Sequence, residues 1–445
     1  MGAVIEWNHQ LISRYGAAAL AGDSYPQATQ FHSAIAALDL LRALRSSRRA
    51  QRPLSLGVQL PPGGNGACDA YLQRLACEID MLACHLGPEQ RVLRLHLGGG
   101  IPDAAGLRRL MVQLQRRFNF QPDDSADRSI EIDLPRTDWA TMGLLRELGF
   151  NHVSIGVPDI HPGEGGRVVD FQDPRQIRSL IEAARTLHFR SVNIDLGYGR
   201  AWQTPASFSR KLAAIIELQP SQVLVFDYAH PPRRYRSFKR IVASGFAAQA
   251  DKLAMQQQAV AQLLAAGYCY IGLGQYALPD DDLAIAQETG QLHRNCQGYS
   301  RHADCDHLGF GVSASSQVGE LHLQNSGDLK HYQAQLDLGQ LAIARGLRCT
   351  PDEQVRRAVI ERLLCDFQVN FAAIDTRFGL VFREYFATVW PQLELMAREG
   401  LILLGADRLS VLPAGRLLVG AVCKVLEHNR LAGGAPTALL ALADC

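Results

Sequence analysis

The sequence predicts an α/β protein, with a barrel of parallel strands followed by a helical unit. Two observations support this fold class. Between about residues 51 and 300, short apolar runs alternate with longer amphipathic segments, the pattern of repeated strand–helix units. From about residue 335 helical patterns replace the short apolar runs. We therefore expect mostly six β/α units and then a separate helical domain.

The predicted strands are short runs of apolar and β-branched residues, which suit strands packed under helices. They are Leu54–Leu60, Val92–Leu97, Ser129–Asp133, His152–Val157, Ser191–Leu196, Gln222–Tyr228 and Tyr268–Leu273.

The segments between these runs carry apolar residues at helical spacing. They are Asp69–His85, Ala104–Phe118, Trp139–Leu148, Pro174–Leu187, Pro205–Leu218 and Leu253–Ala266. A regular alternation of this kind indicates parallel strands, and parallel barrels place their functional residues at the carboxyl ends of the strands.

The two ends of the chain have other patterns. Residues 1–35 predict an N-terminal arm with a short helix at Trp7–Leu20, residues 36–334 the barrel domain, and residues 335–445 the C-terminal helical domain. Within the last domain the expected elements are helices and one small hairpin at residues 401–412. The expected helices are Asp337–Ala344, Asp352–Cys365, Phe382–Gly400 and Pro413–Asn429. This order suggests a winged-helix-like domain, and Leu431–Cys445 is expected to be a frayed tail.

Composition restricts the function. Lys and Arg number 45 and Asp and Glu 44, so no excess charge favours nucleic acid or a membrane surface. No apolar run reaches the roughly 18 residues of a membrane span. The ten cysteines are scattered without close pairing, which suits a reducing compartment. We expect a cytoplasmic protein without nucleic-acid or membrane partners.

Glycines and carboxylates stand where predicted strands end. Gly98, Gly99 and Gly100 leave the backbone open to a ligand, with N–H groups available to bind it. Glu131 and Asp195 each lie at the end of a predicted strand, where a carboxylate can hold a cationic group. A barrel would bring these positions together at one edge.

Several stretches resemble, in chain order, the oxygen-independent coproporphyrinogen III oxidase family of the radical S-adenosylmethionine (SAM) superfamily. The resemblance extends from about Arg52 to Arg430. The matching stretches are Leu95–Pro102, Ser129–Pro135, His152–Asp159, Asn193–Gly199, Phe226–Pro231, His293–Tyr299 and Gly309–Ala314.

The resemblance implies a fold and a set of site residues. The fold is a radical-SAM-type partial (β/α)6 barrel, similar to a TIM barrel. The family's SAM pocket corresponds here to Gly98, Gly99, Gly100, Glu131, Asp195, Ala229 and Gln297. The family's reaction is the oxidative decarboxylation of two propionates of coproporphyrinogen III to vinyl groups, using SAM and a [4Fe–4S] cluster.

The chain departs from the family pattern in the chemistry. The family holds its cluster on a C-x3-C-x2-C loop after the first strand, whereas Pro61–Ala67 contains no cysteine. Pro158 replaces a ligand-contacting Gln, and the family's Arg is missing near Val169–Gln172. We therefore expect no cluster, no catalytic residue and, at most, weak binding of SAM.

Three functions follow from these departures. The favoured hypothesis is an inactive paralogue that binds a tetrapyrrole, such as coproporphyrin or haem, or regulates an active enzyme. The first alternative is an active coproporphyrinogen III dehydrogenase with non-standard cluster ligands or a partner's cluster. The second alternative is a cluster-free SAM enzyme.

The remaining cysteines give little support for a metal elsewhere. Cys68, Cys77 and Cys84 lie on one predicted helix, and the last two are about 10.5 Å apart along its axis, too far to share a cluster. Cys296, His302, Cys305 and His307 have a spacing that zinc sites can show, but packing roles explain them more simply. We expect no metal site.

Overall fold

The computed structural model describes residues 5–21, 25–61, 65–121, 125–157, 174–231 and 245–427. The chain forms two compact units that are discontinuous in sequence. The first, here called the barrel unit, comprises residues 28–268 and 302–349. The second, called the C-terminal unit, comprises residues 1–27, 269–301 and 350–445. The domain boundaries expected from sequence, at residues 35 and 334, stay a prediction.

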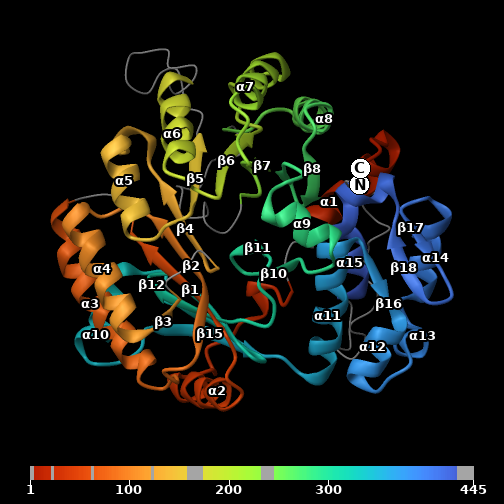
Figure 1. Ribbon diagram of the computed structural model, residues 1–445. Coiled ribbons are helices and arrows are strands. Elements are labelled where there is room, and N and C mark those ends of the chain that lie inside the picture. Colours follow the sequence, from red (N-terminus) through yellow and green to blue (C-terminus); the bar gives the residue numbers. More distant parts are fainter. Residues whose placement is uncertain are drawn as a thin grey trace. The chain divides into compact units, whose positions relative to one another are not determined.

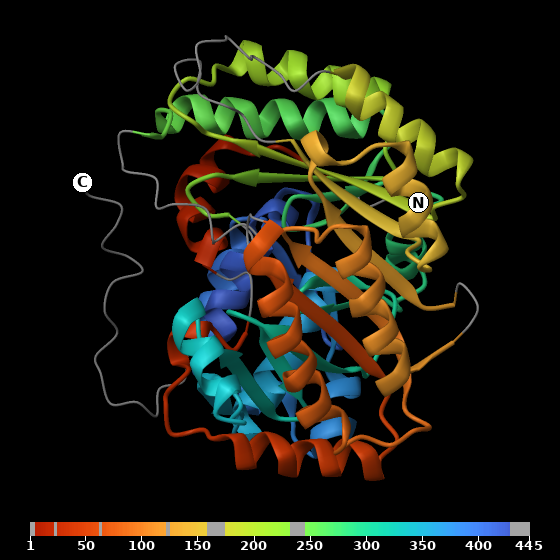
Figure 2. The same cartoon turned by 90° about the vertical axis from the view of Figure 1, so that its left-hand side faces the viewer.

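The barrel unit is built on six parallel strands that lie side by side in chain order. They are β1 (Leu54–Leu60), β2 (Arg91–Gly99), β4 (Asp127–Ile132), β5 (His152–Val157), β6 (Ser191–Tyr198) and β7 (Gln222–Asp227). Each is followed by a helix, in turn α3 (Asn65–Ala83), α4 (Ala104–Arg117), α5 (Trp139–Glu147), α6 (Pro174–Thr186), α7 (Pro205–Glu217) and α8 (Gln249–Ala265). Figures 1 and 2 show these helices along one side of the strands. The predicted six β/α units are confirmed.

Local sequence explains where several of these helices begin. Asp103 accepts a hydrogen bond from Gly106 N and caps α4, and Asp138 does the same for Thr141 N in α5. Thr204 caps α7, with Pro205 at the first helical position. Such caps satisfy backbone N–H groups that have no partner inside the helix.

A second group of strands extends the sheet beyond β1. Strand β12 (Asp306–Gly311) pairs parallel with β1. Three antiparallel strands follow it: β13 (Ser315–Val318), β14 (Leu321–Asn325) and β15 (Ile343–Arg348). Two helices complete the unit, α2 (Ala37–Arg49) and α10 (Leu329–Asp337), and the two-residue β3 (Asn119–Phe120) pairs with the start of β2.

The helix predicted at Asp337–Ala344 is wrong. Helix α10 ends where that prediction begins, Gly339 has a φ of +70°, and the chain then enters β15. The stabilising partner of this segment is β14, which lies about twenty residues earlier in the chain. Local helical spacing does not reveal such a pairing.

The parallel strands separate an apolar layer from a polar one. The face of each strand that packs against the helices carries buried apolar residues, which include Leu56, Leu95, Ile130, Ile155 and Ile194. The alternate residues face the barrel interior and include a series of polar side chains: Ser55, Gln59, His96, Ser129, Glu131, Ser154, Asn193 and Asp195. A parallel sheet buried on both faces is usually apolar on both, so the polar interior indicates a functional role.

The C-terminal unit is helical with a small sheet. Its first part holds α1 (His9–Ala21), a hairpin of β8 (Cys269–Gly272) and β9 (Gln275–Ala277), α9 (Asp282–Glu288), β10 (His293–Asn295) and β11 (Gly298–Ser300). Its second part holds α11 (Pro351–Asp366), β16 (Gln368–Asn370), α12 (Phe371–Phe378), α13 (Phe382–Tyr385), α14 (Trp390–Arg398), β17 (Ile402–Leu404), β18 (Arg408–Val411) and α15 (Val419–Leu426).

Several expectations for this unit are confirmed and others need correction. The predicted hairpin is β17 and β18, which form a three-stranded sheet with β16. The single helix expected at Phe382–Gly400 is two helices with a break at residues 386–389, where Phe382 stacks on Phe371 and packs against Phe386. The helix expected from Pro413 begins as a 3-10 turn, Pro413–Leu418. The predicted tail, Leu431–Cys445, lies outside the described residues, and no described helix is long and apolar enough to cross a membrane.

Candidate functional site

The ends of β2 and β4 form the first part of the candidate site. Gly99 N donates a hydrogen bond to Glu131 Oε2 over 3.1 Å, and His96 Nε2 lies 3.4 Å from Glu131 Oε1. His96 Nδ1 lies 2.8 Å from Ser129 Oγ, so the imidazole connects the two strands. These contacts hold the Glu131 carboxylate against the glycine stretch on the barrel interior.

The backbone at this corner requires glycine. Gly99 has a φ of +93°, and a Cβ added there would lie 2.0 Å from Leu60 O at the end of β1. A Cβ on Gly98 would lie 3.3 Å from both Gln59 Oε1 and Glu131 Oε2. The glycine stretch therefore lets three strand ends and one carboxylate approach each other closely.

Asp195 on β6 and its neighbour Ser154 on β5 form the second part of the candidate site. Its Oδ2 accepts a hydrogen bond from Ser154 Oγ over 3.0 Å, and its Oδ1 accepts one from Asn193 Nδ2 over 2.7 Å. Asn193 Nδ2 also contacts Ser154 Oγ at 2.8 Å. Asp195 is 2% exposed, so these donors offset the cost of burying its charge.

The end of β7 carries an ion pair that sequence reasoning missed. Asp227 Oδ2 lies 2.9 Å from Lys252 Nζ, and Asp227 Oδ1 accepts a hydrogen bond from Ala229 N over 2.8 Å. Although burial acts to raise it, the pKa of Asp227 is lowered by hydrogen bonds from His230, Ala229 N and Lys252. The N–H of Ala229, a predicted site residue, is thus already donated to Asp227.

Arg200, just after β6, is a second residue that the sequence analysis missed. Its guanidinium carbon lies 4.1 Å from the centroid of the Tyr228 ring. A basic residue directly after a strand that ends in Gly197-Tyr198-Gly199 is the signal that could have identified it. Gly98–Gly100, Glu131, Asp195, Ala229, Asp227 and Arg200 all belong to the carboxyl-terminal edge of the barrel strands.

The remaining predicted positions belong to the C-terminal unit or lie outside the described residues. Gln297 belongs to the C-terminal unit, in the turn between β10 and β11, where its N–H donates to Asn295 Oδ1 over 2.9 Å. Pro158 and Val169–Gln172 lie outside the described residues, as do the loop residues 62–64 and the side chain of Cys68.

The four residues with zinc-like spacing do not form a cluster within either unit. Cys296 belongs to the C-terminal unit and the other three to the barrel unit. His302 Nε2 lies 3.1 Å from Asp127 Oδ2, and His307 Nδ1 lies 3.2 Å from Ser55 Oγ. Burial raises the pKa of Cys305 to about 12, which disfavours the thiolate that binds metal. Among the described residues of each unit taken alone, no three cysteines or histidines could hold one metal ion.

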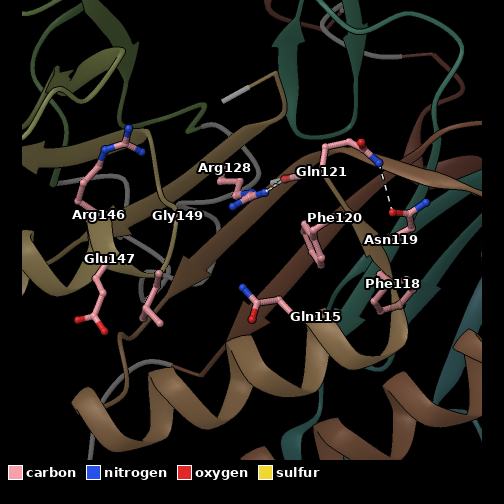
Figure 3. Close-up of a pocket in the computed structure, with 10 residues that line it drawn as sticks. Gln115, Phe118, Asn119, Phe120, Gln121, Arg128, Arg146, Glu147 and Gly149 are labelled. Atoms are coloured by element: carbon pink, nitrogen blue, oxygen red, sulfur yellow. Dashed lines mark hydrogen bonds between the residues drawn. The ribbon is translucent and has the colours of Figure 1, made fainter. Parts of the chain in front are cut away.

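A pocket of about 820 Å³ lies at the opposite, amino-terminal edge of the strands. Figure 3 shows Arg128 beside Gln121, whose side chain is hydrogen-bonded to Asn119. Arg128 donates to Gln121 O and packs over the Phe120 ring, 5.4 Å from its centroid. Glu147 in the pocket wall is bound by both terminal nitrogens of Arg108, at 2.6 and 2.8 Å. Because these charged groups bind within the protein and no predicted site residue lines the pocket, we assign it a structural role.

Replacing Gly149, which lines this pocket, by alanine is expected to destabilise the protein by about 2–3 kcal/mol. Gly149 has a φ of +89°, and an added Cβ would lie 2.2 Å from Arg128 Nη1. Gly267→Ala is the matched control, since Gly267 also follows a helix, has a φ of +87° and has nothing within 4 Å of its added Cβ. The free energy of unfolding, measured with urea, should fall by only about 1 kcal/mol in the control. Equal losses in the two variants would contradict a steric role for Arg128.

Comparison with known proteins defines first the class and then the family. The structure superposes on that of a coproporphyrinogen III oxidase from Escherichia coli described as a radical SAM enzyme, with a TM-score of 0.86 and 35% identity over 95% of this chain and 99% of that chain. The fold is therefore that of a radical SAM enzyme. Residues 349–418 match the HemN C-terminal domain model.

The sequence relatives are more specific. The chain is 48% identical to an oxygen-independent coproporphyrinogen III oxidase from Pseudomonas aeruginosa, over 95% of this chain and 96% of that protein. It is 37% identical to the enzyme of the same name from Escherichia coli K12, over 95% of each. The chain belongs to the oxygen-independent coproporphyrinogen III oxidase family.

These relatives overturn the expectation that the protein has no cofactor. That prediction is wrong, because nearly the whole chain matches proteins whose fold and name are those of radical SAM enzymes, which use SAM with an iron–sulfur cluster. The prediction relied on three short segments, Pro61–Ala67, Pro158 and Val169–Gln172, whereas the similarity to the relatives covers 95% of the chain.

The described residues include groups that suit SAM, but they do not include the loop in which the family holds its cluster. The glycine stretch and the Glu131 and Asp195 carboxylates offer N–H donors and acceptors on the barrel interior. Residues 62–64 and the side chains of residues 65–68, which adjoin the end of β1, are outside the described part of the chain. We therefore assign no thiolate ligand.

Proposed function

We propose that the protein oxidises coproporphyrinogen III without oxygen, converting two propionate side chains to vinyl groups with release of carbon dioxide. The oxidant would be SAM, one molecule for each propionate, which would be reduced to methionine and 5′-deoxyadenosine. The observation that carries this proposal is the 48% identity to the Pseudomonas aeruginosa oxidase over 95% of the chain. The polar side chains on the barrel interior support this proposal, since an interior lined only by apolar side chains could not bind ionic ligands.

Within the barrel unit, the proposed SAM site comprises Gly98, Gly99, Gly100, Glu131, Asp195 and Ala229. Gln297, which belongs to the C-terminal unit, stays a prediction. Bound SAM supplies the radical chemistry of this enzyme class. Glu131, positioned by Gly99 N and His96, would hold the SAM ammonium group by a charge-assisted hydrogen bond. Asp195 accepts hydrogen bonds from Ser154 and Asn193, and a carboxylate held in place in this way suits a ligand hydroxyl.

A second candidate function is tetrapyrrole binding without turnover, as in a carrier or a regulator of an active enzyme. The observation that favours it is the sequence from Pro61 to Ala67, which contains no cysteine where the family pattern has three. This function uses the same barrel interior but requires no radical chemistry.

An anaerobic turnover assay tests the first function. Protein reconstituted with iron and sulfide is incubated with coproporphyrinogen III, SAM and a reductant, and the products are oxidised and separated by chromatography. We expect protoporphyrin together with 5′-deoxyadenosine, both dependent on SAM. Glu131→Gln, which keeps the side-chain size and removes the charge, should lower turnover by about 10- to 100-fold.

The opposite result is equally informative. If folded wild-type protein of known iron content yields neither product, the oxidase proposal is wrong. Titration of the same preparation with coproporphyrin III or haem, followed by the shift of the porphyrin absorption band, then tests the second function. Micromolar binding without turnover would support it.

We also propose that the protein works in the cytoplasm. None of the eight cysteines that the structure describes forms a disulfide, which suits a reducing compartment. Fractionation of cells that express the tagged chain checks this assignment.

A further inference from the structure

Arg200 lies at the carboxyl-terminal edge of the barrel strands, on a rigid support. Its backbone N donates to Gln203 Oε1 over 2.8 Å, and Gln203 Nε2 donates in turn to Gly197 O over 3.1 Å. Ala201 N donates to Gly245 O over 3.0 Å. These bonds fix the chain that follows β6.

The Arg200 guanidinium is stacked on the ring of Tyr228, which in turn lies against a glycine of β6. The Tyr228 ring lies over Gly197, where an added Cβ would be 2.4 Å from the ring carbon Cζ. Gly197 lies on the same face of β6 as Asn193 and Asp195, because every second residue of a strand points to the same side. The Tyr228 ring therefore occupies the face of the strand that carries Asp195. Arg200 Cζ lies 4.1 Å from the centroid of Tyr228 and 5.5 Å from that of Trp202. A guanidinium stacked in this way keeps the N–H donors at its edge available.

The charge of Arg200 is not neutralised by any described residue. No carboxylate among these residues lies within ion-pair distance of its guanidinium, and its buried Nε has no hydrogen-bond partner among them. The neighbouring cation Lys252 is different, because it is paired with Asp227 at 2.9 Å. A partly buried guanidinium with an oriented ring beneath it and no anion beside it is suited to an anionic ligand.

We propose that Arg200 binds a carboxylate of the tetrapyrrole, namely one of its propionate side chains. This inference rests on the proposed function and identifies a residue that anchors the substrate. Coproporphyrinogen III carries four propionates and the reaction converts two of them, so the protein must fix the orientation of the macrocycle. A planar guanidinium suits this task because it can bind a carboxylate through two parallel hydrogen bonds.

The test is a binding titration with coproporphyrin III, the stable oxidised form of the substrate. Wild-type protein, Arg200→Gln and Arg200→Lys are compared at several salt concentrations by porphyrin fluorescence. We expect Arg200→Gln to weaken binding by about 10- to 100-fold and to reduce the dependence of the Kd on salt. Arg200→Lys should recover part of the loss, which a purely structural role of the stacked guanidinium would not predict.

Arg210→Gln is the matched control, because Arg210 lies exposed on α7 and its replacement by glutamine removes the same charge. It should leave the Kd unchanged, and the melting temperatures of all variants should agree within a few degrees. SAM, which also carries a carboxylate, is titrated separately and should bind wild type and Arg200→Gln equally.

Three results would overturn the inference: no binding of coproporphyrin III to wild type, equal Kd values for wild type and Arg200→Gln, or a loss confined to SAM. Failure of the proposed function looks different, because it is an absence of turnover by a protein that still binds coproporphyrin III.

Discussion

Gly99→Ala is expected to destabilise the protein by about 3–5 kcal/mol and to abolish SAM-dependent turnover. Two costs combine at this position. A φ of +93° is unfavourable for any residue with a Cβ, and the new Cβ would lie 2.0 Å from Leu60 O, a backbone atom that cannot rotate away. Relief requires the ends of β1 and β2 to separate, which displaces Gly99 N from Glu131.

Gly379→Ala separates the two costs. Gly379 follows α12 with a φ of +67°, and nothing lies within 4 Å of its added Cβ, so it carries only the conformational cost of about 1–2 kcal/mol. Urea unfolding of both variants provides the comparison. If Gly99→Ala loses no more stability than Gly379→Ala, the close approach of β1 and β2 is not a constraint on the sequence.

The second large effect is expected at Glu78, a buried carboxyl on α3. Glu78 Oε2 accepts hydrogen bonds from Gly311 N at 2.8 Å and from Tyr332 Oη at 2.6 Å, and Oε1 accepts one from Asn325 Nδ2 at 2.6 Å. Removal of the carboxyl by Glu78→Ala leaves three buried donors without an acceptor. At about 1–3 kcal/mol for each donor, we expect a loss of at least 3 kcal/mol.

The effect should reach the candidate site through the same helix. Tyr71, two turns before Glu78 on α3, donates to Gln59 O over 2.7 Å and accepts from Val312 N over 2.9 Å. Together these bonds fix the ends of β1 and β12. We therefore expect Glu78→Ala to lower turnover as well as the free energy of unfolding.

Glu78→Gln is the control for Glu78→Ala, because glutamine keeps the size of the side chain. The same variant tests whether the stability that Glu78 contributes depends on pH. Burial raises the pKa of Glu78 from its ordinary value of 4.5 to about 7, and the hydrogen bonds that its oxygens accept from Tyr332, Gly311 N and Asn325 oppose this rise. Because the folded-state pKa is higher than the unfolded one, the stability that this group contributes is present below about pH 4.5 and is lost as the pH rises through 7. Glutamine does not titrate.

The measurement is the free energy of unfolding of wild type and Glu78→Gln at pH 5 and pH 8. The difference between the two proteins should shift by up to about 3 kcal/mol in favour of Glu78→Gln at the higher pH. A difference that does not change with pH would mean that Glu78 is ionised throughout this range.

The sequence by itself determined the β/α core of the barrel. The six strands β1, β2, β4, β5, β6 and β7 carry apolar residues on the face that meets a helix, and the helices carry them at helical spacing. This pattern can therefore be recognised in the local sequence. The motifs around Gly98, Glu131 and Asp195 also carried the family resemblance, which the comparisons confirm.

The sequence was a poor guide wherever the stabilising partner lies far along the chain. The helix expected at Asp337–Ala344 overlaps the start of β15, whose partner β14 lies about twenty residues earlier in the chain, and the break between α13 and α14 adjoins the stacking of Phe382 on Phe371. The family cofactors were misjudged for a different reason, since a few short segments were given more weight than a match over 95% of the chain.

Only the tertiary structure decided how the polar groups at the strand ends combine. It paired Asp227 with Lys252, placed Gly99 N on Glu131, and set the Arg200 guanidinium over the Tyr228 ring without a carboxylate beside it among the described residues. Such contacts join neighbouring strands whose residues are tens of positions apart in the chain. Local sequence pattern fixes which face a side chain occupies, but the register between strands fixes which other side chain it meets.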